Sequence, residues 1–376
     1  MPSEVGGGFY WVLRGACRAA AELRQPAIGT DTLLISLMNN FPAFRTVLGP
    51  NPAGARGGER GSAEDDHVEI PPSVELELLR TMRETHWQEY GRSRVASRRD
   101  VPQWAAEAET AARLAMAIAV ARDAPWVGAD HLLEALVSDP ANAASYFVRR
   151  QGVDLELLTQ VARRTWPVAG GEPPRRALAD LLHRVGVLAG PGDQSRPGSA
   201  ALTHRLAAGA VRLIAGTGPV LAFLEDEAIA ETVRLGHDRT TLTHLVLAVL
   251  VLEEQMAATG LRPAREYQVT CDFVLRSFAL DRESVSVTVA SIAQHGTIAP
   301  PQRRRSWRSS PKNPPWTVAA VRAAEAARSA TFAGSAHLLH AVLAGSDESV
   351  RRLLREHAVD PAAVVDLLAR RLARTP

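Results

Sequence analysis

The sequence predicts an all-α protein with two tandem domains, each built from two related helical repeats. The main observation is an apolar pattern that recurs four times along the 376 residues. In three copies a histidine is followed by apolar residues at positions +1, +2, +5 and +6, with a small residue at +4. These copies start at His131, His244 and His337, and Thr32 takes the place of the histidine in the first copy. Such spacing forms one apolar helix face, and the small residue allows a second helix to approach closely.

The register of the copies is the second observation. His131 and Asp154 are 23 positions apart, as are His337 and Asp360. Each repeat is therefore expected to comprise about four helices, and two repeats to form one domain. We expect a first domain at 9–166, with repeats at about 9–90 and 104–166, and a second at 200–374, with repeats at about 200–293 and 316–374. Residues 167–199 hold two Gly/Pro clusters and are expected to be a linker with a short helical segment.

Turn and cap residues predict where the helices begin and end. In the first domain we expect helices at 9–23, after 30, at 73–90, at 105–121, after 128, from 146 and from 154. Thr30, Ser73 and Asp154 are the expected N-caps. In the second domain we expect helices at 225–235, after 243, around 273–278, after 281, from 316, after 337 and from 360, with an insertion at 253–263.

Composition indicates a soluble globular protein, with 46% hydrophobic and 22% charged residues. The formal charge of +2 gives no general attraction to nucleic acid or membranes. No stretch approaches the roughly 20 apolar residues of a membrane span, and the N-terminus lacks the basic start of a signal peptide. A cytoplasmic protein is therefore expected. Cys17 and Cys271 lie in apolar periodic stretches and are expected to be buried free thiols.

Two stretches resemble the Gly-Thr-Glu-His-(apolar)-Leu-Leu motif of the Clp chaperone N-terminal domain, found in ClpA- and ClpC-type unfoldases. They are Val127–Leu136, with the sequence VGADHLLEAL, and Ile28–Leu34, with the sequence IGTDTLL. Gly152–Val153–Asp154 also matches that family's second half-repeat. The resemblance covers most of the chain. It implies two tandem Clp N-type domains, each of two helical repeats related by a pseudo-twofold axis, of which the second domain is more diverged.

The resemblance does not extend to the motor of those unfoldases. Their ATPase modules carry a G-x-x-x-x-G-K-[ST] phosphate loop, whereas the sole lysine of this chain, Lys312, follows no glycine-rich loop. We find no catalytic nucleophile motif and no metal-ligand spacing, so no enzymatic activity, cofactor or metal is expected. The three repeated histidines are expected to be hydrogen-bonded core residues.

The family's N-domains bind client or adaptor segments, and some bind phosphorylated arginine through the acidic residue before the histidine. That position is Asp31 in the first repeat and Asp130 in the second, and Thr30 adjoins the first of these. Thr243 and Ala336 occupy it in the second domain. The alternative is that both aspartates stabilise the first turn of their own helices.

The resemblance also implies a hydrophobic groove that receives peptides and cyclic peptide antibiotics. Phe9, Tyr10 and Trp11 are the candidate groove residues, because the family carries a phenylalanine near its beginning. The alternative is that these aromatic residues fasten the first helix to the core.

Together these observations predict a non-enzymatic binding protein. Its expected partners are Clp unfoldase or protease components, client peptides or cyclic peptide ligands, toward which it acts as adaptor, competitor or decoy. Two alternatives stay open. One is a nucleic-acid-linked regulator that uses the basic segment 302–312 around Trp307, and the other is an oligomeric scaffold.

Overall fold

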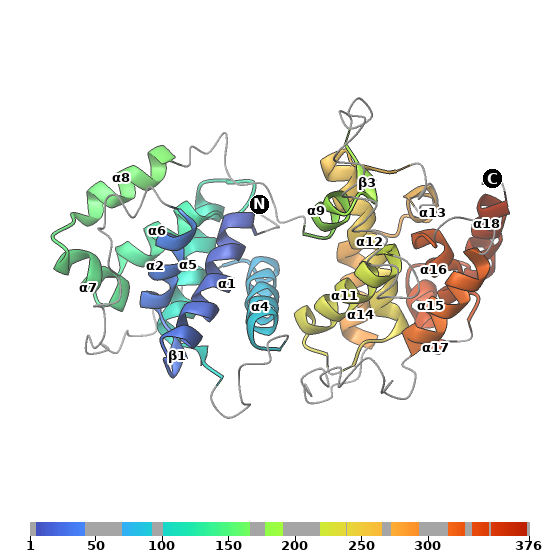
Figure 1. Cartoon of the computed structure of the whole chain (residues 1–376), viewed down its shortest axis with the longest axis horizontal. Helices are drawn as coiled ribbons and strands as arrows, with labels where there is room; N and C mark the ends of the chain where they lie inside the picture. Colours follow the sequence, from blue (N-terminus) through green and yellow to red (C-terminus); the bar gives the residue numbers. More distant parts are fainter. Residues whose placement is uncertain are drawn as a thin grey trace. The chain divides into compact units, whose positions relative to one another are not determined.

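The computed structural model describes residues 5–41, 70–91, 101–165, 177–190, 219–237, 239–264, 272–292, 315–327, 333–345 and 347–373. These residues are mostly helical, with a few two-residue strands (Figure 1), which confirms the all-α class. The chain divides into two compact units, residues 1–175 and 176–376. Each unit has its own apolar core and is considered separately.

The first unit is built from paired helices. It contains α1 (Gly7–Glu22), α2 (Thr30–Asn40), α4 (Pro72–His86), the π-helical turn η2 (Trp87–Gly91), α5 (Ala106–Ala121), α6 (Ala129–Ser138), α7 (Ala143–Arg150) and α8 (Leu155–Thr165). Two short strands, β1 (Ala27–Ile28) and β2 (Gln103–Trp104), pair in parallel.

Reciprocal contacts join the two repeats of this unit. Ile28, just before α2, is paired with Trp104, just before α5. Val5, just before α1, is paired with Val127, just before α6. The helices follow the same exchange, because α1 packs against α2 and α6 while α5 packs against α6 and α2. The first two helices of each sequence repeat therefore contact those of the other repeat.

Small residues mark the close helix crossings. The four small residues of the recurring pattern are all buried: Ser36, Ala135, Ala248 and Ala341. In the first repeat Gly15 of α1 faces Ser36 of α2 so closely that a Cβ atom on Gly15 would overlap the Ser36 hydroxyl. The small residue thus permits the close approach that the sequence predicts.

The second unit is also built mainly from helices. It contains α9 (Ala177–Arg184), α11 (Pro219–Arg234), α12 (Leu242–Thr259), α13 (Asp272–Ser277), α14 (Arg282–Ile292), α15 (Pro315–Ala326), α16 (Ser335–Leu343), α17 (Glu348–Glu356) and α18 (Pro361–Ala373). Strands β3 (Leu188–Ala189) and β4 (Arg262–Pro263) pair in an antiparallel manner. Helix α11 packs on α12 and α16, and α15 packs on α16 and α12.

Part of the expected linker is a packed element. Helix α9 and strand β3 fall within 167–199, and Leu178, Ala179 and Leu182 lie in the core of the second unit. They are buried because α12 continues to Thr259 and gives α9 a surface on which to pack. The expected insertion at 253–263 is therefore the last part of α12 together with β4. Residues 167–176 and 191–199 lie outside the described residues.

Helix α12 is unusually apolar. Among the described residues it is the one helix long and apolar enough to cross a membrane. However, 72% of this stretch is buried inside the second unit. Burial of this kind is typical of the central helix of a packed domain.

Several helix starts differ from the expected ones. Helix α2 has Gly29 as its N-cap, not Thr30. Helix α4 begins at Pro72, one residue before the expected cap Ser73. Helix α7 begins at Ala143, because the side chain of Asn142 accepts a hydrogen bond from the Ser145 N–H (2.8 Å) and caps it three residues early.

Replacing Gly15 with alanine tests the close crossing. At an exposed helical site this change stabilises a protein by about 0.5–1 kcal/mol, but here the new methyl group meets Ser36. We expect Gly15→Ala to destabilise the protein by about 1–3 kcal/mol, measured by urea unfolding. The added change Ser36→Ala removes the hydroxyl and should recover part of the loss. Unchanged or higher stability of Gly15→Ala alone would contradict the close crossing.

Candidate functional site

Three helices begin with the same hydrogen-bonded turn. The backbone N–H of the N-cap residue donates to Nδ1 of the histidine three residues later. The N···N distances are 3.0 Å from Gly128 to His131, 3.0 Å from Thr241 to His244 and 3.2 Å from Gly334 to His337. The three histidines are at most 5% exposed. They are hydrogen-bonded core residues, as the sequence predicts, and each satisfies a donor that the start of a buried helix leaves free.

This bond fixes the protonation of the rings. Because Nδ1 accepts a hydrogen bond, the proton of each neutral ring resides on Nε2. Burial lowers the pKa of His131 and His337, and in His131 the Asp130 carboxylate acts in the opposite direction. Burial and the neighbouring His237 lower the pKa of His244 to about 3. Its Nε2 lies 2.8 Å from Nδ1 of His237, so the neutral His244 ring donates to His237.

Helix α2 starts differently, because Thr32 replaces the histidine. The Thr32 hydroxyl donates to the Gly29 carbonyl (2.7 Å). In the histidine turns, by contrast, the side chain accepts a hydrogen bond from the N-cap residue. A carboxylate from the other repeat completes this helix start: Glu107 of α5 lies 3.5 Å from the Thr30 N–H. The positive end of α2 therefore already faces a negative charge.

The candidate residues Asp31 and Thr30 are engaged within the protein. Asp31 accepts hydrogen bonds from the Gln25 side chain (2.8 Å) and from the Thr32 N–H (2.8 Å). Thr30 is fully buried, and its hydroxyl lies 3.4 Å from the N–H of Ala144 at the start of α7. Asp31 thus stabilises the first turn of its own helix, and Thr30 offers no surface to a ligand.

Asp130, the second candidate aspartate, has a different environment. One carboxylate oxygen lies 3.2 Å from Nδ1 of His131, and the side chain is 13% exposed. That nitrogen already accepts the N–H of Gly128 and carries no proton, so the contact is not an ion pair while the ring is neutral.

The three aromatic candidates separate into two environments. Phe9 and Tyr10 are 0% and 2% exposed and belong to the core of the first unit. Trp11 is 48% exposed, and the guanidinium of Arg14 lies 5.2 Å from its ring centroid. Phe9 and Tyr10 therefore fasten α1 to the core, because that face of α1 packs inward. A role in a surface groove rests on Trp11 alone among these three.

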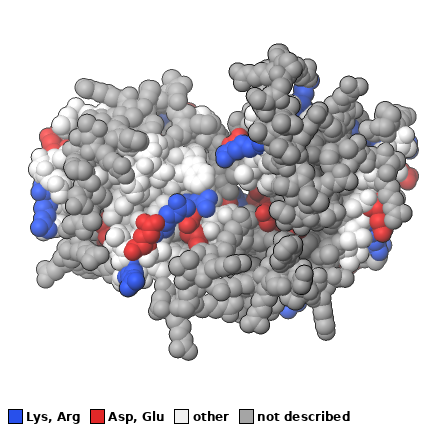
Figure 2. All heavy atoms as spheres, viewed as in Figure 1, with Lys and Arg blue, Asp and Glu red and all other residues white. Residues whose placement is uncertain are grey.

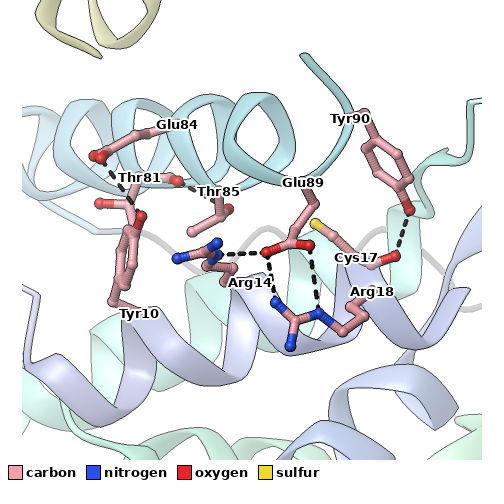
Figure 3. A network of polar contacts seen from close by, with 9 residues as sticks. All are labelled: Tyr10, Arg14, Cys17, Arg18, Thr81, Glu84, Thr85, Glu89 and Tyr90. Atoms are coloured by element: carbon pink, nitrogen blue, oxygen red, sulfur yellow. Dashed lines mark hydrogen bonds and ion pairs between the residues drawn. The ribbon is translucent and has the colours of Figure 1, made fainter. Parts of the chain in front are cut away.

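Arg14, which lies over the Trp11 ring, belongs to a polar network that the sequence did not predict. Figure 3 shows this network. Arg14 and Arg18 of α1 both form ion pairs with Glu89 of η2. The Tyr90 hydroxyl donates to the carbonyl of Cys17. The i, i+4 spacing of the two arginines indicates that they share one face of α1. Their partner cannot be found from that spacing, because it is more than 70 positions away in the sequence.

The contact between α1 and α4 also buries polar groups. The Tyr10 hydroxyl lies 3.5 Å from a carboxylate oxygen of Glu84, which is 1% exposed. Burial and the Glu89 carboxylate raise the pKa of Cys17, so this buried free cysteine stays a thiol. These contacts fix α4 and η2 on α1 and hold the Trp11 surface in place.

The remaining candidates give little further chemistry. No three histidine, cysteine, aspartate or glutamate side chains of the described ranges gather as a metal site would require. Cys271 and the basic segment 302–312 lie outside those ranges. Figure 2 shows arginine and acidic side chains next to each other on the viewed face.

No protein-family model, no curated protein and no solved structure matches the chain.

Acid should destabilise the protein through the three cap histidines. Their pKa values are lower in the folded chain than the usual 6.5, so their stabilisation is complete above pH 6.5. This stabilisation is lost as the pH falls below 6.5. For His244 the loss continues down to its pKa in the folded chain, about 3. The unfolding free energy should fall by up to about 1.4 kcal/mol per pH unit for each histidine.

Urea unfolding between pH 7 and pH 4.5 measures this effect. Asparagine also accepts the N-cap bond but does not titrate, so His244→Asn should show a shallower pH dependence than the natural chain. Contributions from carboxylates are shared by both proteins and cancel in the comparison of slopes. Equal slopes would show that His244 does not titrate on unfolding.

Proposed function

We propose that this chain is a non-enzymatic binding protein whose first unit recognises peptide or adaptor segments in the manner of a Clp N-terminal domain. One observation carries the proposal: both repeats of the first unit retain an acidic residue in the first turn of the motif helix, Asp31 and Asp130. These 376 residues carry no phosphate loop, and the proposal concerns recognition alone.

Asp130 is the residue we assign to ligand binding. Asp31 is held by Gln25, and the start of α2 faces the Glu107 carboxylate, which would repel a phosphate group. Within the part of the chain that the structure describes, no side chain donates a hydrogen bond to Asp130, because the neighbouring His131 nitrogen carries no proton. A carboxylate of this kind pairs well with a guanidinium group, as in arginine or phosphorylated arginine.

The start of α6 is joined to the start of α1 by a backbone hydrogen bond. The Gly6 N–H donates to the Val127 carbonyl (2.8 Å), so the start of α1 lies against the start of α6. Trp11 and Asp130 are each within about two helical turns of this junction. The proposed ligand is therefore a peptide with an arginine-type group for Asp130 and an apolar side chain for Trp11.

By sharing ligands with a full unfoldase, such a protein would act as an adaptor, competitor or decoy. The proposed partners are Clp unfoldase or protease components, their client peptides, or cyclic peptides directed at them.

Fluorescence anisotropy with a labelled peptide containing one phosphorylated arginine tests the proposal. We expect saturable binding to the full chain and at least about tenfold weaker binding to Asp130→Asn. Asp31→Asn should have a smaller effect, because Asp31 is already occupied within the protein. Glu156→Gln, which neutralises an exposed carboxylate of α8, is the matched control and should bind normally. Absence of binding, or equal loss in the control, would refute the assignment.

A further inference from the structure

The same hydrogen-bonded turn precedes helices α2, α6 and α12. Each turn contains one residue with a positive φ, and these residues are Arg24, Asp123 and Gly236. In all three turns the N–H of the next residue donates to the carbonyl oxygen five positions earlier, at 2.9 Å from Gln25, 3.0 Å from Ala124 and 2.9 Å from His237. The N-cap follows five positions after the positive-φ residue in each case, at Gly29, Gly128 and Thr241. Gln25, Ala124 and His237 therefore occupy equivalent positions in three repeats.

In two of these repeats the side chain at this position bonds to the first turn of the following helix. Gln25 donates to the Asp31 carboxylate of α2 (2.8 Å). Nδ1 of His237 accepts from Nε2 of His244 in α12 (2.8 Å). Both Gln25 and His237 are half-buried, so a group in this place is in contact with solvent as well as with the helix start.

The second repeat of the first unit has Ala124 at this position, and alanine has no polar side-chain atom. Nε2 of His131 has no hydrogen-bond partner among the described residues, although His131 is only 5% exposed. The bond from the Gly128 N–H to Nδ1 fixes the ring proton on Nε2, so the ring presents a buried N–H donor. Because an unpaired buried donor is costly, a ligand that supplies an acceptor gains affinity there.

The charges around His131 select the kind of acceptor. The Asp130 carboxylate lies 3.2 Å from Nδ1, and the Glu134 carboxylate is close enough to act on the pKa of the ring. Both oxygens of Glu134 are bonded to Nη2 of Arg122 (2.6 and 2.5 Å), and neither bonds to Nε2 of His131. Two carboxylates beside one guanidinium disfavour an anionic acceptor. The acceptor that fits is therefore neutral.

We infer that the Nε2–H group of His131 and the surface around Ala124 form a binding site for a neutral imidazole ring, such as the histidine side chain of a peptide. One ring nitrogen of the ligand accepts from His131, as Nδ1 of His237 accepts from His244 in the other unit. The site adjoins Asp130 but does not rest on the function proposed for that residue. A guanidinium group carries only donors and cannot serve as the acceptor.

Imidazole itself is the probe, titrated into the full chain at about pH 8, where it is neutral. The readout is the ¹H–¹⁵N signal of the His131 Nε2–H group. We expect a saturable shift of this signal, with affinity that Ala124→His weakens at least about tenfold because the new side chain occupies the site as His237 does. Pyrrole is the matched control ligand, because it has the same ring size and an N–H group but no acceptor nitrogen. It should give no saturable shift.

His237→Ala is a second test, which adds no bulk to the core. This change removes the acceptor from Nε2 of His244, so imidazole should then also shift the His244 signal, which it leaves unchanged in the natural chain. Circular dichroism checks that both variants are folded. If Ala124→His does not fold, the lack of a new response at His244 in His237→Ala would overturn the proposal.

Three other results would overturn it as well. They are no saturable shift at His131, an equal response to pyrrole, and unchanged affinity in folded Ala124→His. Magnetisation transfer from water to the His131 Nε2–H group that persists at saturating imidazole would also do so, because the acceptor would then be an internal water molecule.

Discussion

The hydrogen bond from a backbone N–H to a buried imidazole is the interaction on which the rest of the structure depends. The motif helices α6, α12 and α16 begin inside apolar surroundings, where unpaired N–H groups are costly. Nδ1 of the histidine accepts one of these groups, and the ring itself fills space in the core. A serine or aspartate could accept the same bond but would leave more of that space unfilled.

Once these helix starts are fixed, the apolar face that follows each histidine points into the core. The helix that precedes it can then approach closely, because the facing position is small, as Gly15 and Ser36 show. The first repeat departs from the rule at Thr32, and its helix start depends on Glu107 of the second repeat. The two repeats of the first unit are therefore coupled electrostatically as well as through their apolar contacts.

The sequence was sufficient to predict the features that local patterns determine. The all-α class, the buried histidines and the final helices after Asp154, Asp281 and Asp360 follow from helical periodicity and capping chemistry, and the structure has all of them. These features depend on neighbours a few positions apart. A single sequence shows such neighbours directly.

Features that depend on distant partners could not be predicted. The burial of α9 depends on the extension of α12 by several turns, and the local Gly/Pro clusters suggested a linker instead. Thr30 is buried by α7, and Glu89 reaches arginines more than 70 positions away. Local spacing carries no information about these pairings. The candidate site therefore changes in detail, from two equivalent aspartates to one engaged and one less engaged carboxylate.

The most direct test of this account is a ¹⁵N NMR titration of the imidazole rings in the full chain. We predict that His131, His244 and His337 are neutral at pH 6.5, with the proton on Nε2 and Nδ1 unprotonated. We also expect His244 to stay neutral well below that pH in the folded protein. A proton on Nδ1 of these rings, or titration near the usual pKa of 6.5, would contradict the histidine caps from which the fold is derived.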